Sequence, residues 1–183
     1  GSVKFANNVT LTGMTVAGNN FNASFTGGSN SIAGVTTFSN TGTLTIGDGS
    51  GDSTAFTGGV VATAPSSKSI AGTISAAGTG VINLGSTGVN ATASATVGGT
   101  STGQITLGAT TLADGVTLTL GAASPVSVTS VTGTALNAVS NLTINVADDA
   151  TLPAVSIGAV GTDIGAVTVT QSSGTTFTGT VNA

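Results

Sequence analysis

The chain has 183 residues, of which only 4% are charged, and its formal net charge is −4. Ordinary globular domains contain about 25% charged residues. Two lysines cannot form a basic patch, which argues against nucleic-acid binding through phosphate contacts. The absence of cysteine excludes disulfides and thiolate chemistry. No apolar run approaches the roughly 18–20 residues of a membrane helix, so we expect no membrane-spanning segment.

The composition separates an ordered chain from a disordered one. Low charge together with 29 glycines also occurs in low-complexity chains. Disorder, however, normally combines low hydrophobicity with high net charge. Here 39% of the residues are hydrophobic, and β-branched residues recur at regular spacing. We therefore expect one ordered, repetitive β domain over residues 1–183, as a segment of a longer or polymerised protein.

Short stretches of alternating apolar and small polar residues follow one another along the whole chain. Such alternation is typical of strands with one buried face. In chain order, these stretches are residues 3–5, 9–12, 14–16, 21–25, 44–46, 60–63, 70–74, 81–84, 89–97, 104–107, 116–120, 126–131, 142–146 and 167–170. Glu and Arg are absent and no segment has a convincing helical period, so the chain is predicted to be all-β.

One tetrapeptide recurs: an aliphatic residue, a small polar residue, an aliphatic residue and glycine. It is clearest at Leu118-Thr119-Leu120-Gly121, and further copies begin at residues 44, 82, 105 and 155. A second unit, Phe-Thr-Gly, begins at Phe25, Phe56 and Phe177. The place of the phenylalanines in repeated strands predicts that they stack in a core.

Many short strands with glycine or asparagine at the turns favour a parallel β-solenoid, with about 20–23 residues per turn and about eight short turns. The intervals between copies of the tetrapeptide are irregular, at 38, 23, 13 and 37 residues. One or two antiparallel β-sandwich (Ig-like) domains are therefore the alternative. Such a sandwich usually has a core tryptophan or a tyrosine corner, and this chain has neither residue.

Phrases such as 54–60 (TAFTGGV), 175–183 (TTFTGTVNA) and Ile82-Asn83-Leu84-Gly85 resemble repeats of secreted bacterial β-strand-repeat proteins. These are the passenger regions of autotransporters and filamentous-haemagglutinin-like adhesins. The resemblance is spread over most of the chain. It implies a right-handed β-helix, export across the outer membrane and a place on the bacterial outer surface or outside the cell. It implies no role for any single residue.

The side chains offer little reactive chemistry. Histidine, the usual general base, is absent, and so is the arginine of pectin-cleaving β-helices, so we expect no enzymatic activity and no cofactor. The best ligand hypothesis is calcium at Asp48 and Asp52, since carboxylates in a glycine-rich loop suit a hard cation. The competing interpretation is a surface turn in which the aspartates bind their own backbone. Asp148 and Asp149 are a weaker candidate for an ion site.

These observations predict a structural, self-associating component of an extracellular filament, sheath or surface adhesin. Its main partner would be itself, because unpaired strand edges at both ends of a solenoid invite stacking. Host or surface receptors are further candidate partners. One alternative is a pilus-like subunit assembled by donor-strand complementation, with residues 3–12 as the donor. Another is a calcium- or carbohydrate-binding surface module. Threonine pairs such as 117/119 and 168/170 resemble those of ice-binding solenoids, although the uneven intervals argue against a regular array.

Overall fold

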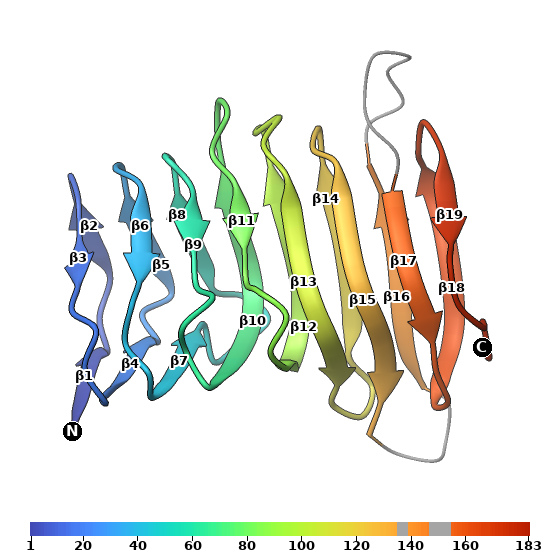
Figure 1. Cartoon of the computed structure of the whole chain (residues 1–183), viewed down its shortest axis with the longest axis horizontal. Coiled ribbons are helices and arrows are strands. Elements are labelled where there is room, and N and C mark those ends of the chain that lie inside the picture. Colours follow the sequence, from blue (N-terminus) through green and yellow to red (C-terminus); the bar gives the residue numbers. More distant parts are fainter. Residues whose placement is uncertain (135–138, 147–154) are drawn as a thin grey trace.

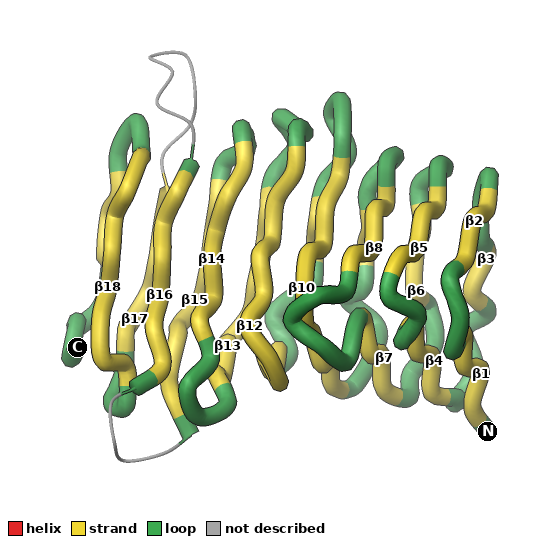
Figure 2. The backbone as a smooth tube through the Cα atoms, turned by 180° about the vertical axis from the view of Figure 1, so that it is seen from behind, coloured by secondary structure: helices red, strands yellow, loops and turns green. Residues whose placement is uncertain are grey.

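The computed structural model describes residues 1–134, 139–146 and 155–183, and all regular structure in these ranges is β-strand. The strands stack side by side along the long axis of the molecule, from the N-terminus at one end to the C-terminus at the other (Figures 1 and 2). Every pairing between the described strands is parallel. The predicted parallel β-solenoid is confirmed, and the antiparallel sandwich alternative is wrong.

The first three levels of the solenoid each consist of three short strands. They are β1 (Ser2–Phe5), β2 (Val9–Leu11) and β3 (Thr15–Val16); β4 (Asn22–Phe25), β5 (Ser29–Ile32) and β6 (Thr36–Phe38); and β7 (Thr43–Ile46), β8 (Ser53–Phe56) and β9 (Val60–Val61). Turns rich in glycine and asparagine separate these strands. Each level therefore has distinct corners.

The later levels contain mostly longer strands, and several of these strands pass around a corner. They are β10 (Ser67–Ala76), β11 (Ile82–Asn83), β12 (Val89–Gly99), β13 (Ile105–Leu112), β14 (Thr117–Ala122), β15 (Val126–Gly133), β16 (Ser140–Asn145), β17 (Val155–Val160), β18 (Ile164–Gln171) and β19 (Thr175–Phe177). For example, β10 pairs with β7 through residues 67–70 and with β8 through residues 73–75. A single strand thus belongs to two faces.

The pairings define three faces. Face 1 contains β1, β4, β7, the beginnings of β10 and β12, and the ends of β13, β15 and β17. Face 2 contains β2, β5, β8, the ends of β10 and β12, then β14, β16 and β18. Face 3 contains β3, β6, β9, β11, the beginnings of β13, β15 and β17, then β19.

Face 3 gives the period of the solenoid. Its eight strands are joined by seven parallel pairings, which corresponds to about seven turns, close to the eight predicted. The residues stacked on this face are Thr15, Thr37, Val61, Asn83, Thr106, Ser127, Ser156 and Thr176. The steps between them are 22, 24, 22, 23, 21, 29 and 20 residues, so five of the seven lie in the predicted range of 20–23.

The irregular intervals of the tetrapeptide now have a physical explanation. Its copies lie on different faces: residues 44–47 on face 1, residues 118–121 on face 2, and the copies beginning at residues 82, 105 and 155 on face 3. Intervals between copies therefore mix whole turns with parts of turns. The same local pattern suits any face, because on all three faces the side chains of a strand point alternately into the core and outward.

The three faces enclose one continuous apolar core. Phe25 from face 1, Phe56 from face 2 and Phe38 from face 3 are fully buried and meet edge to face, with ring centroids 6.0–6.4 Å apart. Phe5 stacks on Phe25 at 4.8 Å. Beyond these rings the core is filled by Ile, Leu and Val from every level. The predicted core role of the phenylalanines is confirmed for these residues.

Glycine is required where two levels approach closely at a corner. Gly72 lies where the register of β10 and β12 shifts, and it has a φ of +69°. A Cβ at Gly72 would collide with the backbone oxygen of Asp52 on the level below. This oxygen accepts a hydrogen bond from the N–H of Thr73 at 2.7 Å, so the two levels cannot separate without losing that bond.

Gly72→Ala should therefore lower the free energy of unfolding by roughly 1–3 kcal/mol, through the left-handed backbone conformation and the steric clash together. The matched control is Gly51→Ala in the nearby β7–β8 loop, where φ is not positive and no atom lies within 4 Å of the added Cβ. Urea unfolding followed by circular dichroism measures both variants. Equal midpoints for the two would contradict this account of the corner.

Candidate functional site

The predicted calcium ligands lie together in the loop between β7 and β8. The Asp52 carboxylate oxygen Oδ2 accepts hydrogen bonds from the backbone N–H groups of Asp48 at 2.8 Å and Gly49 at 2.9 Å. These two bonds hold the pKa of the Asp52 carboxyl below its usual value. The side chain thus closes a tight turn, in line with the competing interpretation.

A calcium ion takes about six to eight oxygen ligands. One oxygen of Asp52 is already engaged by the turn. The parts of the chain that the structure describes contain no group of three or more carboxylate, histidine or cysteine side chains able to hold a metal. Calcium at Asp48 and Asp52 stays a prediction, and the weaker candidates Asp148 and Asp149 lie outside the described residues.

A buried lysine is the feature that the sequence analysis missed. Lys68 lies on face 1 between Leu44 and Val89 in an inward-facing stack, and it is 1% exposed. Its Nζ donates a hydrogen bond to the backbone oxygen of Pro65 at 3.3 Å and contacts the hydroxyl Oγ1 of Thr87. The alternation Ser67-Lys68-Ser69 places the lysine in the apolar phase of its strand, which was the available signal.

Burial lowers the pKa of the Lys68 amine, because the charged form loses its hydration. Lys68 forms no ion pair within the described ranges, so the two oxygen acceptors are its polar partners there. The amine is thus held in the interior of the solenoid, between Leu44 and Val89 of its stack. We therefore interpret Lys68 as a destabilising element of the core.

Face 2 carries a ladder of hydroxyl groups on its outer side. The five residues Thr73, Thr96, Thr119, Thr143 and Thr168 stack in register on consecutive levels. Their sequence intervals are 23, 23, 24 and 25 residues. Ser53 and Ser29 extend the ladder below Thr73, and we call these seven residues the face-2 hydroxyl ladder. Adjacent levels of a parallel sheet are about 4.8 Å apart, so the hydroxyls recur at that spacing.

The expectation that uneven intervals argue against a regular threonine array is wrong. That argument used copies of the tetrapeptide, which lie on different faces, whereas the threonine pairs 117/119 and 168/170 both lie on face 2. The equivalent outer stack on face 1 mixes residue types, with Ser24, Thr45, Ser69, Asn90 and Thr111 in succession. Of these two outward stacks, the one on face 2 contains a run of five identical residues, and the one on face 1 does not.

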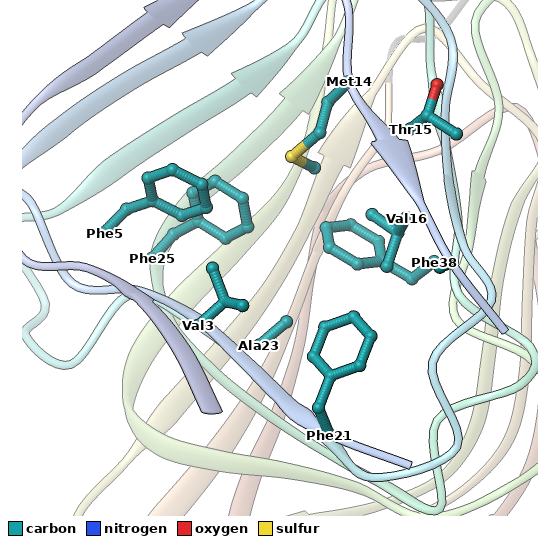
Figure 3. A pocket seen from close by; sticks show the side chains of 10 residues that line it. Val3, Phe5, Met14, Thr15, Val16, Phe21, Ala23, Phe25 and Phe38 are labelled. Carbon is teal, nitrogen blue, oxygen red and sulfur yellow. The ribbon is translucent and has the colours of Figure 1, made fainter. Parts of the chain in front are cut away.

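An apolar hollow of about 290 Å³ opens at the N-terminal end of the solenoid (Figure 3). Its lining comes from the first two levels: Val3, Phe5, Met14, Thr15, Val16, Ala17, Phe21, Ala23, Phe25 and Phe38. None of these residues is charged. The hollow offers mainly apolar surface, to which Thr15 adds a hydroxyl group.

Comparison with known proteins finds no matching family model, no matching curated protein and no matching solved structure. No helix long and apolar enough to cross a membrane occurs among the residues that the structure describes.

Replacing Lys68 with methionine should raise the free energy of unfolding at pH 7 by about 1–3 kcal/mol, because a poorly paired buried polar group is replaced by an apolar chain of similar length. The other lysine, Lys4, is exposed and supplies the matched control Lys4→Met. Thermal or urea unfolding measures both variants. A destabilised Lys68→Met protein would show that the bonds to Pro65 and Thr87 outweigh the burial cost.

The same lysine predicts a pH dependence. Its folded pKa lies below the unfolded value, so the unfolded chain binds more protons in the window between the two. Stability of the wild type should therefore rise as pH rises through the folded pKa toward about 10.4, the ordinary lysine value. The chain has no histidine, cysteine or tyrosine to obscure this alkaline rise. The rise should persist in Lys4→Met and disappear in Lys68→Met.

Proposed function

We propose that this chain is a structural, self-associating rod, a component of an extracellular filament, sheath or surface adhesin. The observation that carries the proposal is the continuous core, in which apolar residues from every level join one cluster along the solenoid. Such a core stiffens the chain over its whole length. With about 4.8 Å between levels, seven steps span roughly 34 Å.

The use of the polar side chains supports this role. Several of them bond the backbone of the next level: Asn8 accepts from the N–H of Ser29 at 2.9 Å, and Asn22 accepts from the N–H of Thr43 at 2.9 Å. At another corner the Ser124 hydroxyl donates to the backbone oxygen of Ser101 at 2.6 Å. These groups hold levels together and are not free to converge on a substrate, which agrees with a role without enzymatic activity.

The low charge favours association between copies of the chain. A chain with two lysines and six aspartates has little electrostatic repulsion between copies. The resemblance to secreted β-strand-repeat proteins agrees with a place on the bacterial outer surface or outside the cell. Surface receptors, calcium and carbohydrate are further proposed partners for which the described residues supply no dedicated site. The donor-strand alternative stays a prediction, and its proposed donor strands β1 and β2 pair with β4 and β5 within the solenoid.

Purified chain should form species larger than the monomer as its concentration rises, and elongated particles should be visible by negative-stain electron microscopy. Sedimentation velocity measures the first effect. The association should persist at high ionic strength, because apolar surface and backbone edges drive it and only charge interactions are screened. A monodisperse monomer at millimolar concentration would overturn the self-associating role.

A second candidate function is adsorption to an ordered, uncharged surface, and we propose ice as that surface. The observation that favours it is the face-2 hydroxyl ladder, with five stacked threonines that present a hydroxyl and a methyl at each level. A regular, uncharged array can match a periodic lattice, whereas an isolated hydroxyl cannot.

Thr119→Lys, at the middle of the threonine run, should abolish most of any thermal hysteresis, because a long charged chain interrupts the array. The control is Thr111→Lys on face 1, where the threonine is similarly half-buried. Both variants should keep the circular dichroism of the wild type. Absence of thermal hysteresis in the wild type would exclude ice binding and leave the structural role untouched.

A further inference from the structure

We propose that the Thr87 hydroxyl is a nucleophile, with the Lys68 amine as its general base, and that it accepts an acyl group from an activated ester. The product is a chain that carries one ester on Thr87. This is a single modification of the chain rather than a turnover reaction. It rests neither on the self-association nor on the ice adsorption proposed above.

The pair lies at the corner where the chain passes from face 3 to face 1. Thr87 belongs to the loop between β11 and β12 and is exposed, whereas Lys68 lies in β10 on the level below and is 1% exposed. The two residues are 19 positions apart in the sequence, and Nζ of Lys68 contacts Oγ1 of Thr87. A side chain that begins in the core thus ends against a hydroxyl of an exposed residue.

The loop that carries the hydroxyl is held at both of its ends. The backbone N–H of Lys68 donates to the backbone oxygen of Gly88 at 3.3 Å, which ties the residue after Thr87 to the lysine's own strand. At the start of the loop, the N–H of Gly85 donates to Oδ1 of Asn83 at 2.9 Å. The amine and the hydroxyl are therefore held in one geometry before any reaction, as intramolecular catalysis requires.

The hydrogen bonds suit a neutral amine that accepts the hydroxyl proton. Nζ of Lys68 donates to the backbone oxygen of Pro65 at 3.3 Å, and its lone pair is then available to the Thr87 hydroxyl. The hydroxyl has a second acceptor in the same Pro65 oxygen, at 3.3 Å. Burial lowers the pKa of the Lys68 amine and so increases its neutral fraction. A hydroxyl beside such a base is the arrangement of an activated nucleophile.

The surroundings of the amine supply no second titratable group. In its stack, Lys68 lies between Leu44 and Val89. The inward residues of the other two faces on the level below, Phe56 and Val60, are apolar as well. Burial and the oxygen acceptors therefore set the protonation of the amine.

The corner around Thr87 suits an uncharged ester. The two loops at this corner, residues 62–66 and 84–88, contain no charged residue. The backbone N–H groups of Ser86 and Thr87 have no hydrogen-bond partner among the described residues. Unpaired N–H groups beside a nucleophile can bind the carbonyl oxygen as it becomes negative during attack.

The transfer balances in two stages. As Oγ1 of Thr87 forms its bond to the carbonyl carbon, the hydroxyl proton passes to Nζ of neutral Lys68. The tetrahedral intermediate then collapses, and the bond between the carbonyl carbon and the leaving oxygen breaks. The leaving oxygen takes the proton from Lys68, or departs as a stable phenolate while that proton passes to solvent. The products are a threonine ester and an alcohol or phenol, and the amine is neutral again.

The probe is p-nitrophenyl acetate, added to the full chain. Absorbance of the released p-nitrophenolate gives the rate, and tandem mass spectrometry locates the acetyl group. Hydroxylamine removes an ester from a hydroxyl but leaves an amide, which separates Thr87 from Lys4 and the amino terminus. Thr41 is the matched internal control, because it is exposed in the β6–β7 loop at the same corner and bonds to no lysine among the described residues.

Thr87 should be acetylated at least about a hundredfold faster than Thr41, which is the lower end of the usual gain from general-base catalysis. The rate should rise with pH through the Lys68 pKa, which lies below that of an ordinary lysine. Lys68→Met and Thr87→Val should lose this reaction, whereas Thr87→Ser and Lys4→Met should keep it. Unfolding cannot explain the loss in Lys68→Met, because that variant should be more stable than the wild type.

Three results would overturn the inference. Equal acetylation of Thr87 and Thr41, or a wild type without an ester on Thr87, would show that the hydroxyl is not activated. An undiminished rate in Lys68→Met would remove the lysine as the base. A hydroxylamine-resistant acetyl group on Lys68 would show that the amine itself is the nucleophile. The proposed rod and its association would stand in each case.

Discussion

The parallel backbone ladder between successive levels is the constraint on which the rest of the structure depends. It fixes a separation of about 4.8 Å between equivalent residues, so each side chain must fit directly above and below a neighbour. Inward positions are occupied by Ile, Leu, Val and Phe, which form one core through all levels. Outward positions are occupied mostly by Ser, Thr and Asn. Because every level needs the same kinds of residue at the same positions, these residue types dominate the composition of the chain.

The scarcity of charge has the same origin. A charged residue repeated at the same position on every level would place like charges within about 5 Å of one another along the whole stack. Such repulsion accumulates with each added level, whereas hydroxyl and amide groups stack without it. The face-2 hydroxyl ladder is one outcome. Lys68, alone in its stack between Leu44 and Val89, faces no like charge and is limited instead by desolvation.

The sequence was sufficient to predict the strands and the solenoid, because alternation and turn residues act locally. It was not sufficient to predict which strands stack. Leu44-Thr45-Ile46-Gly47 and Leu118-Thr119-Leu120-Gly121 are nearly identical but lie on faces 1 and 2. Their glycines also differ, since Gly47 has a φ of +76° and Gly121 lies within an ordinary strand. Stacking order depends on corner lengths, and the hydroxyl ladder becomes visible only when that order is known.

The ladder that stabilises the middle of the solenoid leaves its ends incomplete. An inner level satisfies its hydrogen bonds and buries its apolar residues on both sides, whereas an end level does so on one side only. The exposure of Val3 and Val169, beside the full burial of Leu44 and Ile144 in the same stacks, measures this difference. The local rules that place one level on another do not specify how many levels there should be. A limit on the number of levels must therefore come from whatever covers the end levels.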